Sequence, residues 1–373
     1  MNLPDDYDAV IIGGGIHGCG AALVFSQAGY RCLLLEKQDW AWATSSRSSK
    51  LLHGGLRYLQ TAQFRLVHEC LQERERLLST HPTLARINWF YLPVYRHNRH
   101  APWELFAGLS LYRLLTGWMN PHGRFRIIPK QEWPNLHGLH TDNLQAVFAY
   151  QDGQTDDRLL TCAVKERAVA AGTTAWCPAE VLGAHYRNGQ WQTDINLHDR
   201  VCTVKSNVLI NTSGAWVNDV IARCGSTQSL PMELVQGTHL VLEAQISTEC
   251  FYLEAADGRA VFILPWYEHT LVGTTETPYT GAPEATTPQP EEIQYLLHTV
   301  RTHFPHADLT VREQFSGLRV LPATADRAFS RSRDIRLVDD RGLISLYGGK
   351  LTAHHATAQQ LLKQARPYLQ NAV

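Results

Sequence analysis

The sequence has no feature that would carry the chain across a membrane or out of the cell. Its 373 residues contain no unbroken run of about 18 or more apolar residues, so the sequence predicts no helix that spans a bilayer. The opening residues MNLPDDYDAV are acidic and lack the basic start and the apolar core of a signal peptide. We therefore expect a cytoplasmic protein.

An excess of charge of either sign is also missing. Basic and acidic residues number 34 and 35, which gives a formal net charge of −1. Without an overall positive field to attract a polyanion, the composition does not favour nucleic acid as a partner. The hydrophobic fraction of 44% is ordinary for a globular protein. A chain of 373 residues exceeds the roughly 250–300 residues that one core usually serves, so we expect about two domains.

Cysteine pairs with the spacing of metal ligands are absent. The eight cysteines stand at positions 19, 32, 70, 162, 177, 202, 224 and 250 and never form a CxxC pair. This scatter argues against zinc, an iron–sulfur cluster and a disulfide framework, and it is typical of reduced thiols in the cytosol. We therefore expect no metal site.

What the sequence does contain begins with a strand, a glycine-rich turn and a helix within residues 7–36. YDAVII predicts a buried parallel strand, AALVFSQAG a helix, and RCLLLE a second buried strand. Between the first strand and the helix stands Gly13-x-Gly15-x-x-Gly18. Gly13 permits the tight turn, Gly15 lets the backbone approach a pyrophosphate, and Gly18 permits close packing of the helix on the strand.

Glu36 ends the second strand, where a carboxylate accepts hydrogen bonds from both hydroxyls of a ribose. The same carboxylate would repel a 2′-phosphate, which argues against NADP. The helix N-terminus offers free N–H groups and a positive dipole end to phosphate. The motif leaves open whether the dinucleotide is NAD or FAD, and a purely structural tight turn is the alternative.

The rest of the chain predicts a mixture of helices and strands. Helices are expected over 63–78, from Asp156 to Gly172, over 290–303 and after YGGKLT at the C-terminal end. The segment SNVLI before NTSG reads as a buried strand, and residues 231–275 are rich in strand-forming residues. Hairpin turns are expected at Asn188-Gly189 and at Asp340-Arg341-Gly342.

The segment ATSSRSSKLLHGGLRY, residues 43–58, links the glycine-rich turn to a known family. The two together closely resemble FAD-dependent glycerol-3-phosphate dehydrogenases of the D-amino-acid-oxidase-like flavoprotein superfamily. Further matching segments follow in the order of the family: YQDGQTDD, NTSGAWVND, QGTH, VFILPW, VGTTE, SGLR and YGGKLT. The resemblance implies a short form that lacks the C-terminal domain of the aerobic enzymes.

The fold that the resemblance implies is α/β. A Rossmann-type FAD-binding domain, glutathione-reductase-like and of the D-amino-acid-oxidase type, is expected to interleave with a mixed α+β substrate domain. The FAD-binding domain should comprise residues 1–90, 150–230 and 310–373. The substrate or cap domain should comprise residues 91–149 and 231–309.

The implied activity is oxidation of sn-glycerol 3-phosphate, or a closely related phosphorylated polyol, to dihydroxyacetone phosphate by hydride transfer to flavin N5. Two alternatives stay open: an FAD-dependent oxidase or dehydrogenase of another 2-hydroxy acid or amine, and a noncatalytic FAD-binding paralogue or subunit. The resemblance further implies noncovalent FAD and an electron acceptor that is a quinone or a partner protein. Whether the chain forms a homo-oligomer is also left open.

The residues expected to bind FAD fall in five groups along the chain. Hydroxyls and amides of the Ser-rich loop can wrap a pyrophosphate or flavin, while Lys50 adds charge. Gly54 and Gly55 let the backbone lie against a flat ring. Gly348 and Gly349 are expected to open the last helix and to aim its amides at the flavin. The set is Gly13, Gly15, Gly18 and Glu36; Thr44, Ser45, Ser46, Ser49, Lys50 and Leu51; Gly54 and Gly55; Ser213 and Gly214; and Gly348, Gly349, Lys350, Leu351 and Thr352.

On the substrate side the resemblance assigns four cations and one base. Arginine binds phosphate oxygens bidentately and lysine acts as a point charge, so the expected phosphate contacts are Arg57, Arg319, Arg333 and Lys350. His239 in QGTH is expected to accept the proton of the C2 hydroxyl, with Arg319 and Lys350 completing the catalytic set. A neighbouring cation would lower the pKa of His239 and keep it neutral. His53, His354 and His355 have no assigned role.

Residues 95–130 interleave aromatic, basic and apolar side chains around WELFAGLSLYRLLTGWM. The segment is too short and too charged to span a bilayer, yet it suits a helix that lies in a membrane interface. A helix packed on the second domain is the alternative. The resemblance implies peripheral contact with the inner face of the cytoplasmic membrane, and both interpretations remain open.

Overall fold

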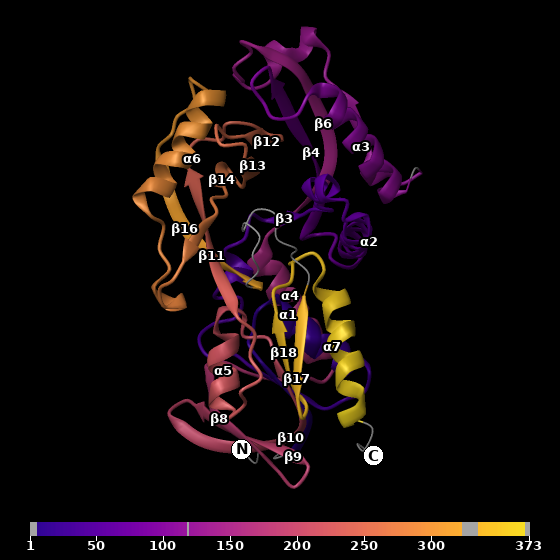
Figure 1. The fold of residues 1–373 in the computed structure, drawn as a ribbon, viewed down its shortest axis with the longest axis vertical. Coiled ribbons are helices and arrows are strands. Elements are labelled where there is room, and N and C mark those ends of the chain that lie inside the picture. The colour runs from indigo at the N-terminus through magenta and orange to yellow at the C-terminus, as the bar shows by residue number, and fades with distance from the viewer. Residues whose placement is uncertain (1–5, 118, 323–334, 370–373) are drawn as a thin grey trace.

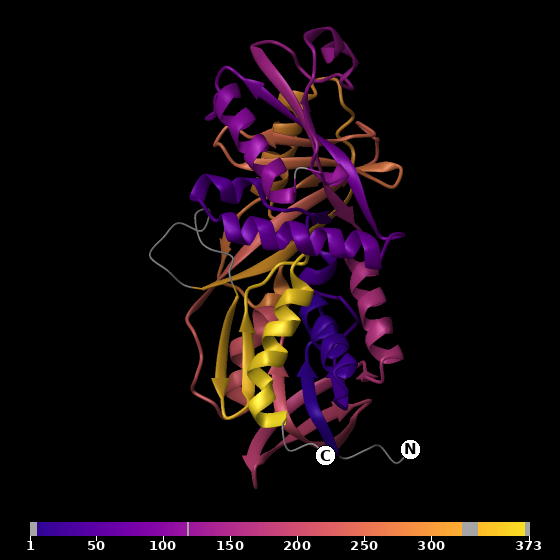
Figure 2. The same ribbon diagram turned by 90° about the vertical axis from the view of Figure 1, so that its right-hand side faces the viewer.

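The computed structural model of the protein describes residues 6–117, 119–322 and 335–369. Within this part of the chain the strands form two sheets, one above the other along the long axis of Figure 1, with helices packed on both. The chain passes between the sheets several times. Figure 2 shows α2 (Phe64–Thr80) crossing the molecule between them.

The first sheet has eight strands and is built around the predicted glycine-rich unit. Its order is β17-β18-β10-β1-β2-β7, and the β8–β9 hairpin continues from β10. The pairs β1–β2, β1–β10, β10–β18 and β2–β7 are parallel. The strands are β1 (Asp6–Ile12), β2 (Cys32–Leu35), β7 (Thr174–Trp176), β8 (Ala179–Arg187), β9 (Gln190–Leu197), β10 (Arg200–Asn211), β17 (Arg336–Asp340) and β18 (Leu343–Tyr347).

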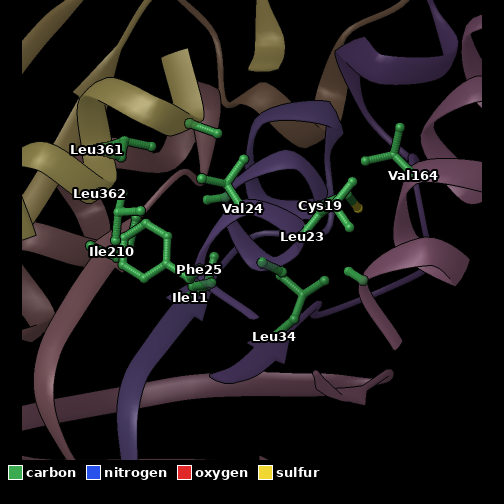
Figure 3. Packing of buried hydrophobic residues seen from close by; sticks show 14 of the residues in the cluster. Ile11, Cys19, Leu23, Val24, Phe25, Leu34, Val164, Ile210, Leu361 and Leu362 are labelled. Carbon is green, nitrogen blue, oxygen red and sulfur yellow. The ribbon is translucent and has the colours of Figure 1, made fainter. Parts of the chain in front are cut away.

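Both faces of this sheet are buried, because side chains alternate along each strand. Ile11, Leu34 and Ile210 pack under α1 (Ile16–Gln27), α4 (Asp157–Ala170) and α7 (His354–Leu369), as Figure 3 shows. The alternate residues Val10 and Leu33 pack toward the β8–β9 hairpin and α5 (Val217–Arg223). The near-continuous apolar runs YDAVII and CLLL therefore have a partner on each side, which is why they form a central parallel pair.

The second sheet has ten strands in the order β15-β11-β14-β13-β12-β4-β6-β3, with β16 on β11 and β5 on β6. Most of its pairs are antiparallel, and β12 with β4 is parallel. The helix α6 (Pro290–His303) packs on one face, and α2 with α3 (Pro102–Thr116) packs on the other. The strands are β3 (Leu51–Leu52), β4 (Ala85–Tyr95), β5 (Phe125–Ile127), β6 (Leu144–Thr155), β11 (Met232–Leu242), β12 (Cys250–Glu254), β13 (Ala260–Trp266), β14 (His269–Gly273), β15 (Thr277–Tyr279) and β16 (Val311–Pro322).

Most of the expected elements are confirmed. The predicted helices appear as α2, α4, α6 and α7, and the two hairpin turns join β8 to β9 and β17 to β18. One expectation is wrong in detail: Gly348 and Gly349 do not open the last helix. They have φ of +76° and +103°, and α7 begins only at His354. Among the described helices, none has the length and apolarity needed to cross a membrane.

Candidate active site

The glycine-rich turn has the tight geometry that its sequence predicts. Gly13 has φ of +108°, and a Cβ there would lie 2.8 Å from the carbonyl oxygen of Thr212. A Cβ on Gly18 would lie 1.8 Å from the carbonyl oxygen of Gly13, so α1 approaches the turn more closely than any side chain allows. Gly15 is the residue that caps the N-terminus of α1. These positions leave the backbone of the turn open to a ligand.

A cavity of about 330 Å³ extends from this turn to the junction of the two sheets. It brings together most of the predicted cofactor residues. Those that line it are Gly13, Gly15, Glu36, Thr44, Ser45, Ser49, Leu51, Ser213, Gly214, Gly348, Gly349, Lys350, Leu351 and Thr352. His239 and Arg319 line the same cavity. Gly18, Ser46, Lys50, Gly54 and Gly55 do not, and each has another place in the structure.

The Ser-rich loop lines the cavity and forms hydrogen bonds to elements of both sheets. Ser45 Oγ accepts a hydrogen bond of 2.9 Å from the backbone N–H of Ile16, in the first turn of α1. Thr44 Oγ1 donates to the carbonyl oxygen of Leu318 on β16 at 2.7 Å. The loop thus links the helix N-terminus that attracts anions to a strand of the second sheet.

Lys50 departs from the expectation that it adds charge beside a pyrophosphate. Its Nζ forms a buried ion pair of 2.5 Å with Asp157 Oδ1 and donates to the carbonyl oxygen of Ser46 at 2.6 Å. Ser48 binds the same carboxylate through its N–H and its hydroxyl. The ammonium group of Lys50 is therefore paired with Asp157, and this ion pair stabilises the loop at the start of α4. Ser46 likewise turns its hydroxyl to the backbone of Trp42 and Ala43.

Gly54 and Gly55 are also explained by contacts within the protein. A Cβ on Gly54 would lie 2.4 Å from Tyr112 Oη and 2.5 Å from Leu71 Cδ2. Gly55 has φ of +80° and packs against the ring of Tyr58. The absence of a side chain at Gly54 is thus required by α2 and α3, and the expected contact with a flat ring is not what demands it.

His239 lies on β11, lines the cavity and is only 2% exposed. Its Nε2 is 3.0 Å from Ser49 Oγ, and its ring stacks on Phe315 with centroids 5.0 Å apart. Burial holds the pKa of His239 well below its ordinary value, and the charges of Arg319 and Lys50 lower it further. The imidazole is therefore neutral at physiological pH and has the protonation state of a base.

Arg319 and Lys350 approach the cavity from opposite sheets. Arg319 Nη1 forms an ion pair of 2.9 Å with Glu276, and its Nη2 donates to Thr274 Oγ1 at 3.3 Å. Lys350 Nζ lies 3.9 Å from the centroid of the Tyr58 ring and 3.6 Å from Cys70 Sγ. Arg57 falls in the 3-10 helix η2 (Leu56–Thr61), where its side chain is not described, and Arg333 lies outside the described residues.

A second cavity of about 90 Å³ adjoins the first. Ser49, Leu51, His53 and Arg319 line both. Arg259, which the sequence analysis did not single out, lines the smaller one together with Glu276. Its signal in the sequence is weak, because one arginine before a strand is usually a surface residue.

Three more residues of the large cavity were missed. His17, in the first turn of α1, is half-buried, and its buried Nδ1 has no hydrogen-bond partner among the described residues. Burial lowers the pKa of His17 to about 4. Trp42 and Trp216 also line the cavity, with ring centroids 5.6 Å apart. Of these three residues, only His17 could have been singled out from the sequence, because it stands inside the glycine-rich motif.

The residues present fit a dinucleotide. Glu36 lines the cavity at the end of β2 and accepts the N–H of Gly14 at 2.7 Å. Burial raises the pKa of Glu36, and hydrogen bonds from Gln38 and Gly14 oppose that shift. A carboxylate at the strand end, an open glycine turn and a helix N-terminus are the parts that bind ribose and pyrophosphate in such folds.

Comparison with known proteins gives the same answer over nearly the whole chain. The model of the FAD dependent oxidoreductase family matches residues 8–364. The chain is 34% identical to a glycerol-3-phosphate dehydrogenase of Synechocystis, over 95% of this chain and 69% of the relative. It is 33% identical to the aerobic glycerol-3-phosphate dehydrogenase of Escherichia coli, over 97% of this chain and 74% of the relative.

A solved structure extends the likeness to three dimensions. The glycerol-3-phosphate dehydrogenase of Bacillus halodurans complexed with FAD superposes with a TM-score of 0.77 at 26% identity. The match covers 98% of this chain and 65% of that one. The expected α/β fold of the D-amino-acid-oxidase type and the resemblance to this dehydrogenase family are thereby confirmed. The chain belongs to the FAD dependent oxidoreductase family.

Proposed function

We propose that this chain oxidises sn-glycerol 3-phosphate, or a closely related phosphorylated polyol, to dihydroxyacetone phosphate. The observation that carries the proposal is that Arg319 lines both cavities, while the neutral His239 lines the larger one. A guanidinium suits a phosphate dianion and a neutral imidazole suits an alcohol proton. The names of the relatives at 33–34% identity support the same substrate.

The larger cavity would hold FAD, noncovalently. Gly13 and Gly15 with the N-terminus of α1 would bind the pyrophosphate, and Glu36 the ribose hydroxyls. The segment from Gly348 to Thr352 would contact the flavin end. FAD, when bound, accepts the hydride from C2 of the substrate.

The protein's own residues then bind the substrate and remove a proton. His239 Nε2 lies 3.0 Å from the hydroxyl oxygen of Ser49, so a hydroxyl can reach this nitrogen. We propose that Nε2 accepts the proton of the C2 hydroxyl as the hydride leaves. Arg319 and Lys350 would hold the phosphate, and Arg57 and Arg333 remain proposed phosphate contacts on the strength of the sequence motifs.

We also propose that the two sheets mark two interleaved domains. Residues 1–90, 150–230 and 310–373 would belong to the FAD-binding domain, and 91–149 and 231–309 to the substrate domain. The strands β3 and β16 fall within the first set yet pair with β6 and β11 of the second sheet. The chain crosses between the proposed domains at these strands, and both lead into the shared part of the cavities.

The proposal is tested by mixing the FAD-loaded protein with sn-glycerol 3-phosphate without oxygen and following the flavin absorbance. Bleaching supports the proposal. Reduction by a 2-hydroxy acid or an amine, but not by the phosphorylated polyol, supports the alternative oxidoreductase. Tight FAD binding with no reduction by any of them supports a noncatalytic role.

We propose further that α3 contacts a membrane surface, where a quinone or a partner protein takes up the electrons. Trp103, Phe106 and Leu114 are exposed by 72%, 49% and 60%, and their spacing places them along one side of the helix. Such a face suits the interface between headgroups and acyl chains.

For the membrane proposal, the variant Trp103→Glu with Leu114→Glu should lose binding to anionic vesicles. Each lost apolar contact weakens binding by roughly tenfold or more, and flavin reduction by substrate should be unchanged. A matched control makes the same substitutions to Glu at Leu182 and Val201, which are exposed by 43% and 67% on the first sheet. Sedimentation with vesicles measures the binding of the variant and of the control. A wild-type protein that stays in the supernatant even at low salt contradicts the proposal.

A further inference from the structure

Glu292 is a buried carboxylate in the first turn of α6. It is 5% exposed and accepts five hydrogen bonds, all from neutral groups. Oε2 accepts from Gln236 Nε2 and Thr238 Oγ1, both at 2.6 Å, and from the N–H of Gln289 at 3.2 Å. Oε1 accepts from Thr275 Oγ1 at 2.7 Å and Thr277 Oγ1 at 2.8 Å.

The donors on β11 alternate with residues of the active site. Gln236 and Thr238 point to Glu292, so Gly237 and His239 point to the opposite face of the strand, where both line the large cavity. Arg319 on β16 pairs with Val235 of β11, which places the arginine on that same opposite face. A Cβ on Gly237 would lie 2.9 Å from Arg319 Nη2, so the strand leaves room for the guanidinium.

The donors after β14 show the same alternation. Thr275 and Thr277 point to Glu292, while Thr274 and Glu276 both bind Arg319. Thr277 is opposite Gln236 in the β15–β11 pair, so the two donors share one face of the sheet. One carboxylate thus joins two segments whose other faces carry His239 and the two partners of Arg319.

The hydrogen bonds have only one consistent direction. A hydroxyl has a single hydrogen to donate. Thr275 Oγ1 gives its hydrogen to Glu292 and accepts the N–H of Thr238 at 2.8 Å. Thr238 Oγ1 gives its hydrogen to Glu292 and must therefore accept from Ser316 Oγ, 2.8 Å away on β16. Reversing any one bond leaves a buried group without its partner.

We infer that Glu292 is a positioning residue for the substrate-binding face, holding Thr274 and Glu276 where they orient the Arg319 guanidinium. The inference rests on the proposed function for the role of Arg319 toward a phosphorylated substrate. The five hydrogen bonds to Glu292, called the clamp below, do not depend on the proposed function, because they are made within the protein.

The test replaces Glu292 with Gln, which keeps the volume but puts an amide NH₂ in place of one oxygen. At the Oε2 position the NH₂ would face the donating amide of Gln236, and at Oε1 it would face Thr275, which already accepts a hydrogen bond. Glu291→Gln is the matched control, because Glu291 is the exposed neighbour in the same turn of α6. Thr277→Val, which removes one donor only, serves as a milder second variant.

Two measurements on the FAD-loaded full chain decide the matter. Amide hydrogen exchange should become faster in residues 232–242 and 270–279 of Glu292→Gln, and not in the control. The KM for sn-glycerol 3-phosphate, measured per bound flavin, should rise by roughly 10- to 100-fold, as for other misplaced contacts. In an Arg319→Ala background the same substitution should change KM no further, because its effect passes through Arg319.

Each outcome has a distinct meaning. Loss of active enzyme with an unchanged KM, or an equal KM effect with and without Arg319, overturns the positioning role and leaves a structural one. The clamp is overturned if amide hydrogen exchange in Glu292→Gln equals that in Glu291→Gln and exchange in Thr277→Val is also unchanged. A wild-type protein whose flavin is not reduced by the substrate refutes the proposed function, and the exchange measurement still decides the clamp.

Discussion

Replacing His239 with alanine is expected to slow reduction of the flavin by sn-glycerol 3-phosphate by roughly 100- to 10,000-fold, the usual contribution of a general base. FAD binding should survive, because the glycine-rich turn and Glu36 follow strands of the first sheet, whereas His239 is on β11 of the second sheet. Stopped-flow absorbance at saturating substrate measures the rate. His303→Ala is a suitable control, since His303 is also buried but lines neither of the two cavities.

The pH dependence gives a second, independent check on His239. Burial first, and then Arg319 and Lys50, hold the pKa of His239 well below 6.5. The base therefore stays deprotonated as the pH falls through 6.5, and the limiting reduction rate should show no acid limb there. In His239→Ala the residual rate should rise with pH, because hydroxide replaces the lost base. A wild-type rate that falls with an apparent pKa near 6.5, or a normal rate in the variant, would contradict the role of His239 as the base.

Gly15→Val is expected to weaken FAD binding by at least roughly 100-fold, since overpacking costs about 1–3 kcal/mol and the pyrophosphate contact is lost as well. A Cβ on Gly15 already lies 3.0 Å from Ser45 Oγ, which binds the first turn of α1. The branched side chain would fill the space at the helix N-terminus. Flavin absorbance after gel filtration measures retention.

The control for this substitution is Gly108→Val on α3, where a Cβ meets nothing within 4 Å. It should purify with its full flavin content. Denaturing the wild type should release all the FAD into the supernatant, as noncovalent binding requires. Full flavin retention in Gly15→Val would contradict the pyrophosphate site, and flavin that stays with the precipitated wild-type protein would contradict noncovalent binding.

Local signals in the sequence were enough to predict the first βαβ unit. YDAVII, the glycine spacing and Glu36 lie within one short segment, and each has a physical role that the neighbouring residues share. The same holds for the hairpins at Asn188-Gly189 and Arg341-Gly342, where the turn residues decide the backbone. The structure confirms all of these elements.

Residues whose role depends on distant partners were not predictable in this way. Lys50 looked like a charge for phosphate, yet Asp157, 107 positions away, takes its ammonium group. Gly54 looked like a surface for a flat ring, yet Tyr112 and Leu71 occupy that space. Glu292 looked like an ordinary residue in the first turn of a helix, and its donors come together only where β11 pairs with β15.

If this protein takes a hydride from a phosphorylated polyol, its flavin should be reduced by that compound alone. FAD-loaded protein is mixed anaerobically with sn-glycerol 3-phosphate, and with glycerol as the matched compound without phosphate, while flavin absorbance is recorded. We expect complete bleaching with the phosphorylated compound, formation of dihydroxyacetone phosphate in equal amount, and little or no bleaching with glycerol. Flavin that stays oxidised with sn-glycerol 3-phosphate, in protein shown to be fully loaded with FAD, would contradict it.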